Sequence, residues 1–186
     1  IGQAKACSYQ WEPIMKNLRL ILTAATAALA FSHTAMAREY YIGGPVHTHD
    51  MEIVANYLVD IELSPMMQPM VHGPDTVHLE ADVHATADNT HGYPDGAWIA
   101  YLTIHYTLEK LGTDWKSEGT LKPMIAKDGP HYANNVAMNG GGKYKVTYLF
   151  TSPESSGFYR HTDKETGVPE WWKPFSQSFE FKYPHK

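Results

Sequence analysis

Ten residues near the middle of the chain, Thr76 to Ala85, alternate strictly between apolar and polar side chains. Successive side chains of a β-strand point to opposite faces, so this pattern predicts a strand with two very different faces. One face carries Val77, Leu79, Ala81 and Val83, and the other carries His78, Glu80, Asp82 and His84. The second row is dense in metal-ligand types. A half-buried strand also needs a polar outer face, and this ordinary explanation is favoured if the segment is taken alone.

The same alternation recurs along the chain and predicts an all-β protein. Further strands are expected at residues 39–46, 51–63, 97–108, 118–124, 144–150 and 175–183, which makes about seven. Turn signals rich in glycine and proline separate them, and no amphipathic helix is expected. This spacing predicts an immunoglobulin-like antiparallel β-sandwich, although the Cys-Trp-Cys pattern of a true immunoglobulin domain is missing. Two long loops are expected at residues 64–75 and 151–174.

The first part of the chain has the features of a targeting segment. Residues 15–37 contain basic residues, a short apolar block and the small-residue run Ala35-Met36-Ala37, so we expect a signal peptide cleaved after Ala37. Residues 1–14 are expected to be an upstream, non-native or mis-annotated segment. Residues 38–186 are expected to form one exported domain without direct membrane insertion. Cleavage removes Cys7, the only cysteine, so packing has to stabilise this domain.

The composition of residues 38–186 argues against polyanionic partners. This domain has a formal charge of −7, since 12 Lys and Arg stand against 19 Asp and Glu. Such a charge argues against nucleic acid and anionic membranes as partners. The same residues include ten of the eleven histidines and six of the eight methionines, and both types are transition-metal ligands.

Three other segments contain candidate metal ligands, each with an ordinary alternative. The first long loop holds Met66, Met67, Met70 and His72, but methionine more often fills gaps in a core. Met124 and His131 flank the Asp128-Gly129-Pro130 turn, which would bring thioether and imidazole together. A strand-end core methionine and a surface histidine explain this pair equally well. His161 lies in the second long loop, where clustered aromatic residues indicate a surface that covers or binds something.

Several motifs together resemble the small periplasmic iron-transport proteins of the FetP type. The segments are VHLEADVHA, GTLKPMIAKDGPHY, GFYRHTDKETGVPEWW, MEIVANYL and WIAYLTIHY, and they span the expected domain in the family's order. The resemblance implies an immunoglobulin-like homodimer that works beside an inner-membrane iron permease and binds copper. It assigns the metal ligands to His78, Glu80, Met124, His131 and His161, with His161 supplied by the partner subunit.

The resulting functional hypothesis is a periplasmic copper-binding accessory protein for iron uptake. Three imidazoles and a thioether suit both Cu(II) and Cu(I), whereas the carboxylate of Glu80 also suits iron or manganese. No nucleophile elbow or phosphate loop indicates a hydrolytic enzyme, and a copper-dependent redox role toward iron stays open. The alternatives are a periplasmic copper carrier for export or resistance, a copper oxygenase that uses an amino-terminal histidine, and a structural β-sandwich.

Overall fold

The structure, a computed structural model, describes residues 38–65, 71, 73 and 75–184. Eight antiparallel strands make up this part of the chain, joined mostly by short turns. The strands are β1 (Glu39–Thr48), β2 (Met51–Leu58), β3 (Thr76–Ala85), β4 (Thr103–Lys110), β5 (Lys116–Ala126), β6 (Gly129–Ala137), β7 (Gly142–Thr151) and β8 (Phe175–Tyr183). The one helix among the described residues is a single 3-10 turn, η1 (Pro153–Ser156).

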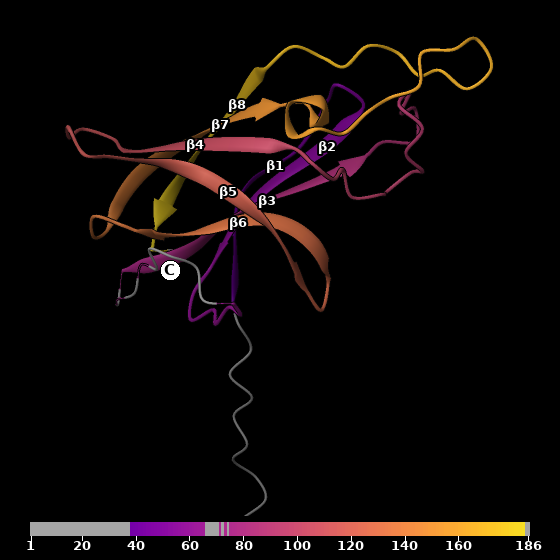
Figure 1. Ribbon diagram of the computed structural model, residues 1–186. Coiled ribbons are helices and arrows are strands. Elements are labelled where there is room, and N and C mark those ends of the chain that lie inside the picture. The colour runs from indigo at the N-terminus through magenta and orange to yellow at the C-terminus, as the bar shows by residue number, and fades with distance from the viewer. Residues whose placement is uncertain (1–37, 66–70, 72, 74, 185–186) are drawn as a thin grey trace, which may run out of the picture. The chain divides into compact units, whose positions relative to one another are not determined.

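The strands follow the order β1-β2-β3-β6-β5-β4-β7-β8 (Figure 1). The arrangement has two halves, one formed by β1, β2, β3 and β6 and the other by β4, β7 and β8. Strand β5 belongs to both. Its residues 116–121 pair with β4, whereas residues 122–126 pair with β6. A strand that changes partners in this way turns the corner of a sandwich. At the two ends of the order, Gly43 on β1 lies against the ring of Phe179 on β8, where a Cβ atom would overlap the ring.

The core lies between the two halves and is rich in aromatic side chains. Its largest fully buried members include Tyr57, Tyr132, Tyr144, Tyr148 and Phe150. Buried phenols need hydrogen-bond partners, and Tyr132 and Tyr148 have theirs on other parts of the core. Tyr132 accepts a hydrogen bond from the Leu102 N–H at 3.0 Å and donates one to the Ile99 carbonyl at 2.8 Å. Tyr148 on β7 donates to the Glu80 carbonyl on β3 at 3.0 Å, which links the two halves.

The all-β antiparallel architecture is confirmed, but the expected strand set was incomplete. The structure adds β6, whose sequence GPHYANNVA lacks clean alternation because its buried residues are consecutive. Two expected strands are also shorter than the pattern indicated. Strand β2 ends before Asp60, and β4 begins after Tyr101. Both residues have positive φ angles, 59° and 63°, which an extended strand does not accommodate.

Several sequence expectations concern residues outside the described part of the chain. These are the upstream segment 1–14, the signal peptide 15–37, and the loop ligands Met66, Met67, Met70 and His72. Within the described residues, no helix has both the length and the apolar character needed to cross a membrane.

Candidate metal centre

The candidate metal centre is built where β3, β6 and β5 lie side by side. Register places His78 opposite Asn135 and Glu80 opposite Ala133 on β6. The β5–β6 hairpin then pairs Met124 with His131. The turn through residues 127–128 therefore brings the thioether and imidazole positions together, because directly opposite side chains of an antiparallel pair share one face.

Three of the expected ligands form a compact buried cluster. His78, Glu80 and His131 each offer one ligand atom, and these atoms all lie within 4.8 Å of one another. The three residues are only 4%, 8% and 7% exposed. The His131 Nδ1 and Glu80 Oε1 atoms are 3.5 Å apart, and the two imidazole rings are perpendicular with centroids 5.9 Å apart. This is the only such group of three among the described residues.

A hydrogen bond orients the His78 ring. Its Nδ1 lies 2.7 Å from the Asn135 Oδ1. An amide oxygen only accepts, so Nδ1 carries the hydrogen and Nε2 keeps a lone pair for a metal ion. Burial lowers the pKa of His78 from its ordinary value, which outweighs the opposing effect of Asn135. The imidazole is therefore neutral at physiological pH, the form that binds metals.

Glu80 and Asp82 are neighbours on the same face of β3 and share a poorly hydrated environment. Burial, and secondarily the charge of Asp82, raises the pKa of Glu80 to about 8. Burial also raises the pKa of Asp82, against the lowering effects of His131 and of its hydrogen bond from Asn56. A buried and a half-buried carboxyl group so close together share protons easily. A bound cation would supply the positive charge that this pair lacks.

Two members of the cluster, Glu80 and His131, line a pocket of about 370 Å³ on the outer side of β1, β2 and β3, whereas His78 lines a separate, smaller pocket. Five carboxyl residues and two histidines line the larger pocket, and its described lining contains no Lys or Arg. The carboxyl residues are Glu39, Glu52, Glu80, Asp82 and Asp128. Such a lining attracts cations and repels anions.

The donor set fits a transition metal, copper included. Two imidazoles and one carboxyl group suit a borderline divalent ion, and a thioether adds affinity for Cu(I). Met124 is half-buried and lies opposite His131 in the hairpin, which is the right neighbourhood for that fourth ligand.

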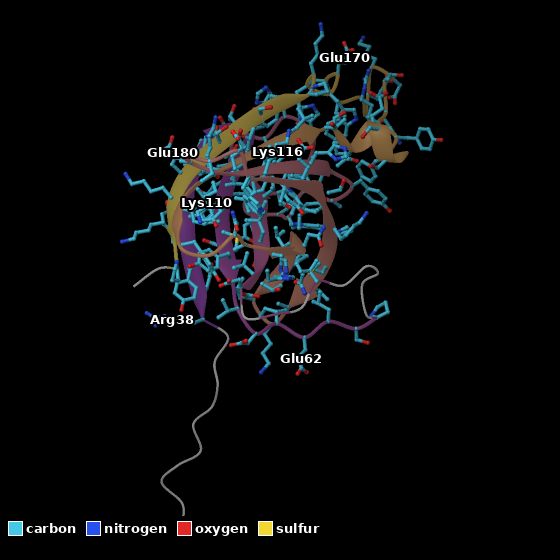
Figure 2. The ribbon with its side chains drawn as sticks, turned by 90° about the vertical axis from the view of Figure 1, so that its left-hand side faces the viewer. Arg38, Glu62, Lys110, Lys116, Glu170 and Glu180 are labelled. Carbon is cyan, nitrogen blue, oxygen red and sulfur yellow. The ribbon has the colours of Figure 1, made fainter. Side chains whose placement is uncertain are left out.

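His161 lies apart from the other expected ligands. It belongs to the long segment between η1 and β8, which extends beyond the strands at the upper right of Figure 1. Its side chain is 74% exposed, and its Nδ1 lies 2.6 Å from Thr166 Oγ1 and 3.7 Å from Asp163 Oδ2. Figure 2 shows Glu170, from the same segment, at the opposite end of the molecule from Arg38 and Glu62.

Sequence reasoning missed two contributors to this centre. Asn135 orients His78 from β6, a strand that was not expected, so no sequence signal pointed to it. Asp128 was seen only as a turn residue, although it lines the acidic pocket. The acidic character of the domain was a general hint, but only the fold brings Glu39 and Asp128 to the same pocket.

Comparison with known proteins identifies the class. Residues 36–184 match the family described as Fe2+ transport proteins, and this chain belongs to that family. A UPF0423 protein of Brucella abortus is 45% identical over 176 residues, covering 91% of this chain and 95% of the relative. The 34 kDa membrane antigen of Treponema pallidum is 34% identical over 150 residues, or 76% of this chain and 71% of the relative.

Two solved structures are particularly similar. One is a copper-bound variant of FetP from uropathogenic Escherichia coli strain F11, with 50% identity and a TM-score of 0.76 over 79% of this chain and 98% of that chain. The other is copper-reconstituted P19 from Campylobacter jejuni, with 43% identity and a TM-score of 0.74 over 79% and 97% of the two chains. The FetP-type resemblance read from the sequence is thereby confirmed.

Proposed function

We propose that this protein is a periplasmic copper-binding accessory protein for iron uptake, which supplies iron to an inner-membrane permease or adjusts its oxidation state. The observation that carries the proposal is the buried cluster of His78, Glu80 and His131, two of which, Glu80 and His131, line an acidic pocket. Membership of the Fe2+ transport family supports the link to iron, and the copper-bound FetP and P19 structures support copper as the resident ion.

Each residue of the cluster has a defined part in this proposal. His78, held by Asn135, and His131 are the imidazole ligands, and Met124 supplies the thioether. Glu80 provides the oxygen ligand, or holds a neighbouring iron or manganese ion. When bound, copper supplies one-electron redox chemistry, while the carboxylates around the pocket concentrate cationic iron near it.

The proposal also includes a homodimer in which His161 completes the partner's site. The exposed position of His161, outside the cluster of its own chain, supports this arrangement. His161→Ala should then weaken copper binding, although it leaves the cluster within each chain intact. A heterodimer of His78→Ala and His161→Ala chains should keep one intact site, because the His161→Ala chain receives His161 from its partner. No intact site in that heterodimer would refute the shared arrangement.

Metal content tests the central claim. The purified protein is exposed to Cu(II), Fe(II), Mn(II) and Zn(II) together and dialysed, beside a His78→Ala/His131→Ala variant. One tightly held copper per chain, lost in the variant, is the expected result. The matched control is His105→Ala, which removes an exposed imidazole from β4 and should leave the copper in place. Equal copper in all three proteins, or in none, would overturn the proposal.

Iron uptake is the second measurement. Cells that lack the gene should grow poorly under iron limitation and recover with the wild-type gene but not with the His78→Ala/His131→Ala variant. A gene deletion that causes copper sensitivity without an iron-limited growth defect would favour the copper-carrier alternative instead.

A further inference from the structure

A second set of metal-ligand side chains lies four residues along β3 from Glu80. In the strand register, Glu52 on β2 is opposite His47 on β1 and opposite His84 on β3. Residues directly opposite one another in antiparallel pairs point to the same face of a sheet. The three side chains therefore form one row across three neighbouring strands, in the order imidazole, carboxylate, imidazole.

His47 and Glu52 of this row are in contact and accessible, and His84 is half-buried and placed beside Glu52 by the strand register. The His47 Nε2 atom is 2.8 Å from the Glu52 Oε2 atom, and the two side chains are 61% and 42% exposed. Glu52 and His84 both line the acidic pocket, so the row stands at its rim. Cβ atoms of directly opposite residues are about 5 Å apart, a distance that ligands to a single ion can span. The described residues contain no second group of three ligand atoms as compact as the cluster, so the His84 side chain has to rotate toward Glu52 to complete this set.

Hydrogen bonds fix the β1–β2 hairpin that carries His47 and Glu52. His47 and Glu52 are the second residue pair from the two-residue turn His49-Asp50, whose φ angles of 52° and 60° match a tight β-hairpin. The Asp50 carboxylate accepts hydrogen bonds from the Thr90 hydroxyl at 2.6 Å and from the Thr90 N–H at 3.1 Å. Ligands on regular, fixed strands are positioned more accurately than ligands on loops.

We propose that His47, Glu52 and His84 form a second binding site for a divalent transition metal, separate from the His78–Glu80–His131 cluster. Two imidazoles and one carboxylate suit Zn(II) and Cu(II). The surrounding charge favours such an ion, because the described residues that line the pocket include further carboxyl groups and no Lys or Arg. The site uses neither His161 nor Met124, so it goes beyond the function proposed above.

Zinc titration of the His78→Ala/His131→Ala protein tests this site, because the cluster is disabled there. Calorimetry should show one Zn(II) equivalent per chain. Long-range ¹H–¹⁵N NMR spectra should show the imidazole signals of His47 and His84 shifting with the same saturation curve, while those of His105 stay fixed. Signals that shift independently of one another, or a protein that binds no Zn(II), would overturn the proposal.

Substitutions in the same background identify the ligands. His47→Gln and His84→Gln should each weaken Zn(II) binding by about tenfold or more, which is the least expected for the loss of one ligand. His105→Gln is the matched control and should change nothing. Unfolding midpoints of the metal-free variants show whether each still folds. Zn(II) affinity that is unchanged in the folded His47→Gln and His84→Gln proteins refutes the site.

The outcomes for the two sites are distinct. Copper retained by the His78→Ala/His131→Ala protein counts against the function proposed above only if it also persists after His47→Gln and His84→Gln, since the row itself suits Cu(II). The proposed site at His47, Glu52 and His84 is tested only by how Zn(II) affinity changes when His47 or His84 is substituted.

Discussion

The outward faces of β3 and β8 share the same alternating sequence pattern but have very different surroundings. On β8, the outward residues Ser176, Ser178 and Glu180 are exposed. On β3, the outward residues His78 and Glu80 are as buried as many core residues. Strand β8 is last in the strand order, whereas β3 lies between β2 and β6, and the start of β1 and the β5–β6 turn reach over the same pocket. The polar face of β3 thus differs from that of β8 because its neighbours partly cover it.

The pH dependence of stability should show the largest difference between the two faces. Because the pKa of Glu80 is raised from 4.5 to about 8, the folded metal-free protein holds a proton that the unfolded chain loses. This stabilisation is complete below about pH 4.5 and disappears as the pH rises to about 8. Glu80→Gln should therefore reduce the loss of stability between pH 5 and 8.5 by an amount on the order of 3 kcal/mol.

Urea unfolding at both pH values, with a chelator present, measures this effect. The control is Glu180→Gln on the exposed face of β8, which should keep the wild-type pH dependence. An identical pH dependence for wild type and Glu80→Gln would show that the carboxyl group of Glu80 is well hydrated, contrary to its 8% exposure.

Removing the residue that orients His78 should have the next largest effect. Asn135→Ala frees the His78 ring, and losing such an outer partner typically weakens metal binding 10- to 100-fold. The matched change is Thr120→Val, which removes the hydroxyl 2.8 Å from His105 Nδ1 on the other half of the sandwich and should leave copper affinity unaltered. Competition titration with a copper chelator gives both affinities. Similar affinities for Asn135→Ala and wild type would mean that Asn135 does not orient a ligand.

A smaller effect is expected from the hydrogen bond that joins the two halves beneath the cluster. Tyr148→Phe leaves the buried Glu80 carbonyl without the phenol donor and should lower the free energy of unfolding by about 1–2 kcal/mol. Thr147→Val, which removes the exposed contact with Ser178, should change it by no more than about 0.5 kcal/mol. Equal losses in denaturant unfolding experiments would contradict the distinction between inner and outer hydrogen bonds.

The smallest effect is expected for an ion pair on the solvated face. Lys116 Nζ and Glu118 Oε1 are 2.6 Å apart on β5, where both side chains are about half exposed. Exposed pairs of this kind contribute little because water screens them. Glu118→Gln should leave the thermal unfolding midpoint within experimental error of wild type. A clear drop would show that this part of β5, just before it turns the corner, depends on the pair.

The sequence predicted most of the strands but not the strand that completes the centre. Alternation identified β3 because its inner face is fully apolar and its outer face is fully polar. In β6 the buried run His131-Tyr132-Ala133 includes residues from both faces, so the same test could not find it. Both faces of β6 are covered there, and a pattern based on one covered face then fails.

The candidate ligands show the same division. Residue types and motif resemblance pointed to His78, Glu80, Met124, His131 and His161 before any geometry was known. The structure brings three of them together and pairs Met124 with His131, while it leaves His161 exposed on its own chain. The contribution of a partner subunit to the site stays a prediction, which the heterodimer experiment tests.

The sequence by itself determined the all-β class, the inward faces of most strands and the chemistry of the possible ligands. These depend on side-chain type and on a two-residue period, which are local properties. The tertiary structure alone decided which polar residues are buried together, which carboxyl groups share a pocket and why the pKa of Glu80 rises. Those properties depend on distances between strands remote in the chain and on the exclusion of water, and the order of the residues does not state either.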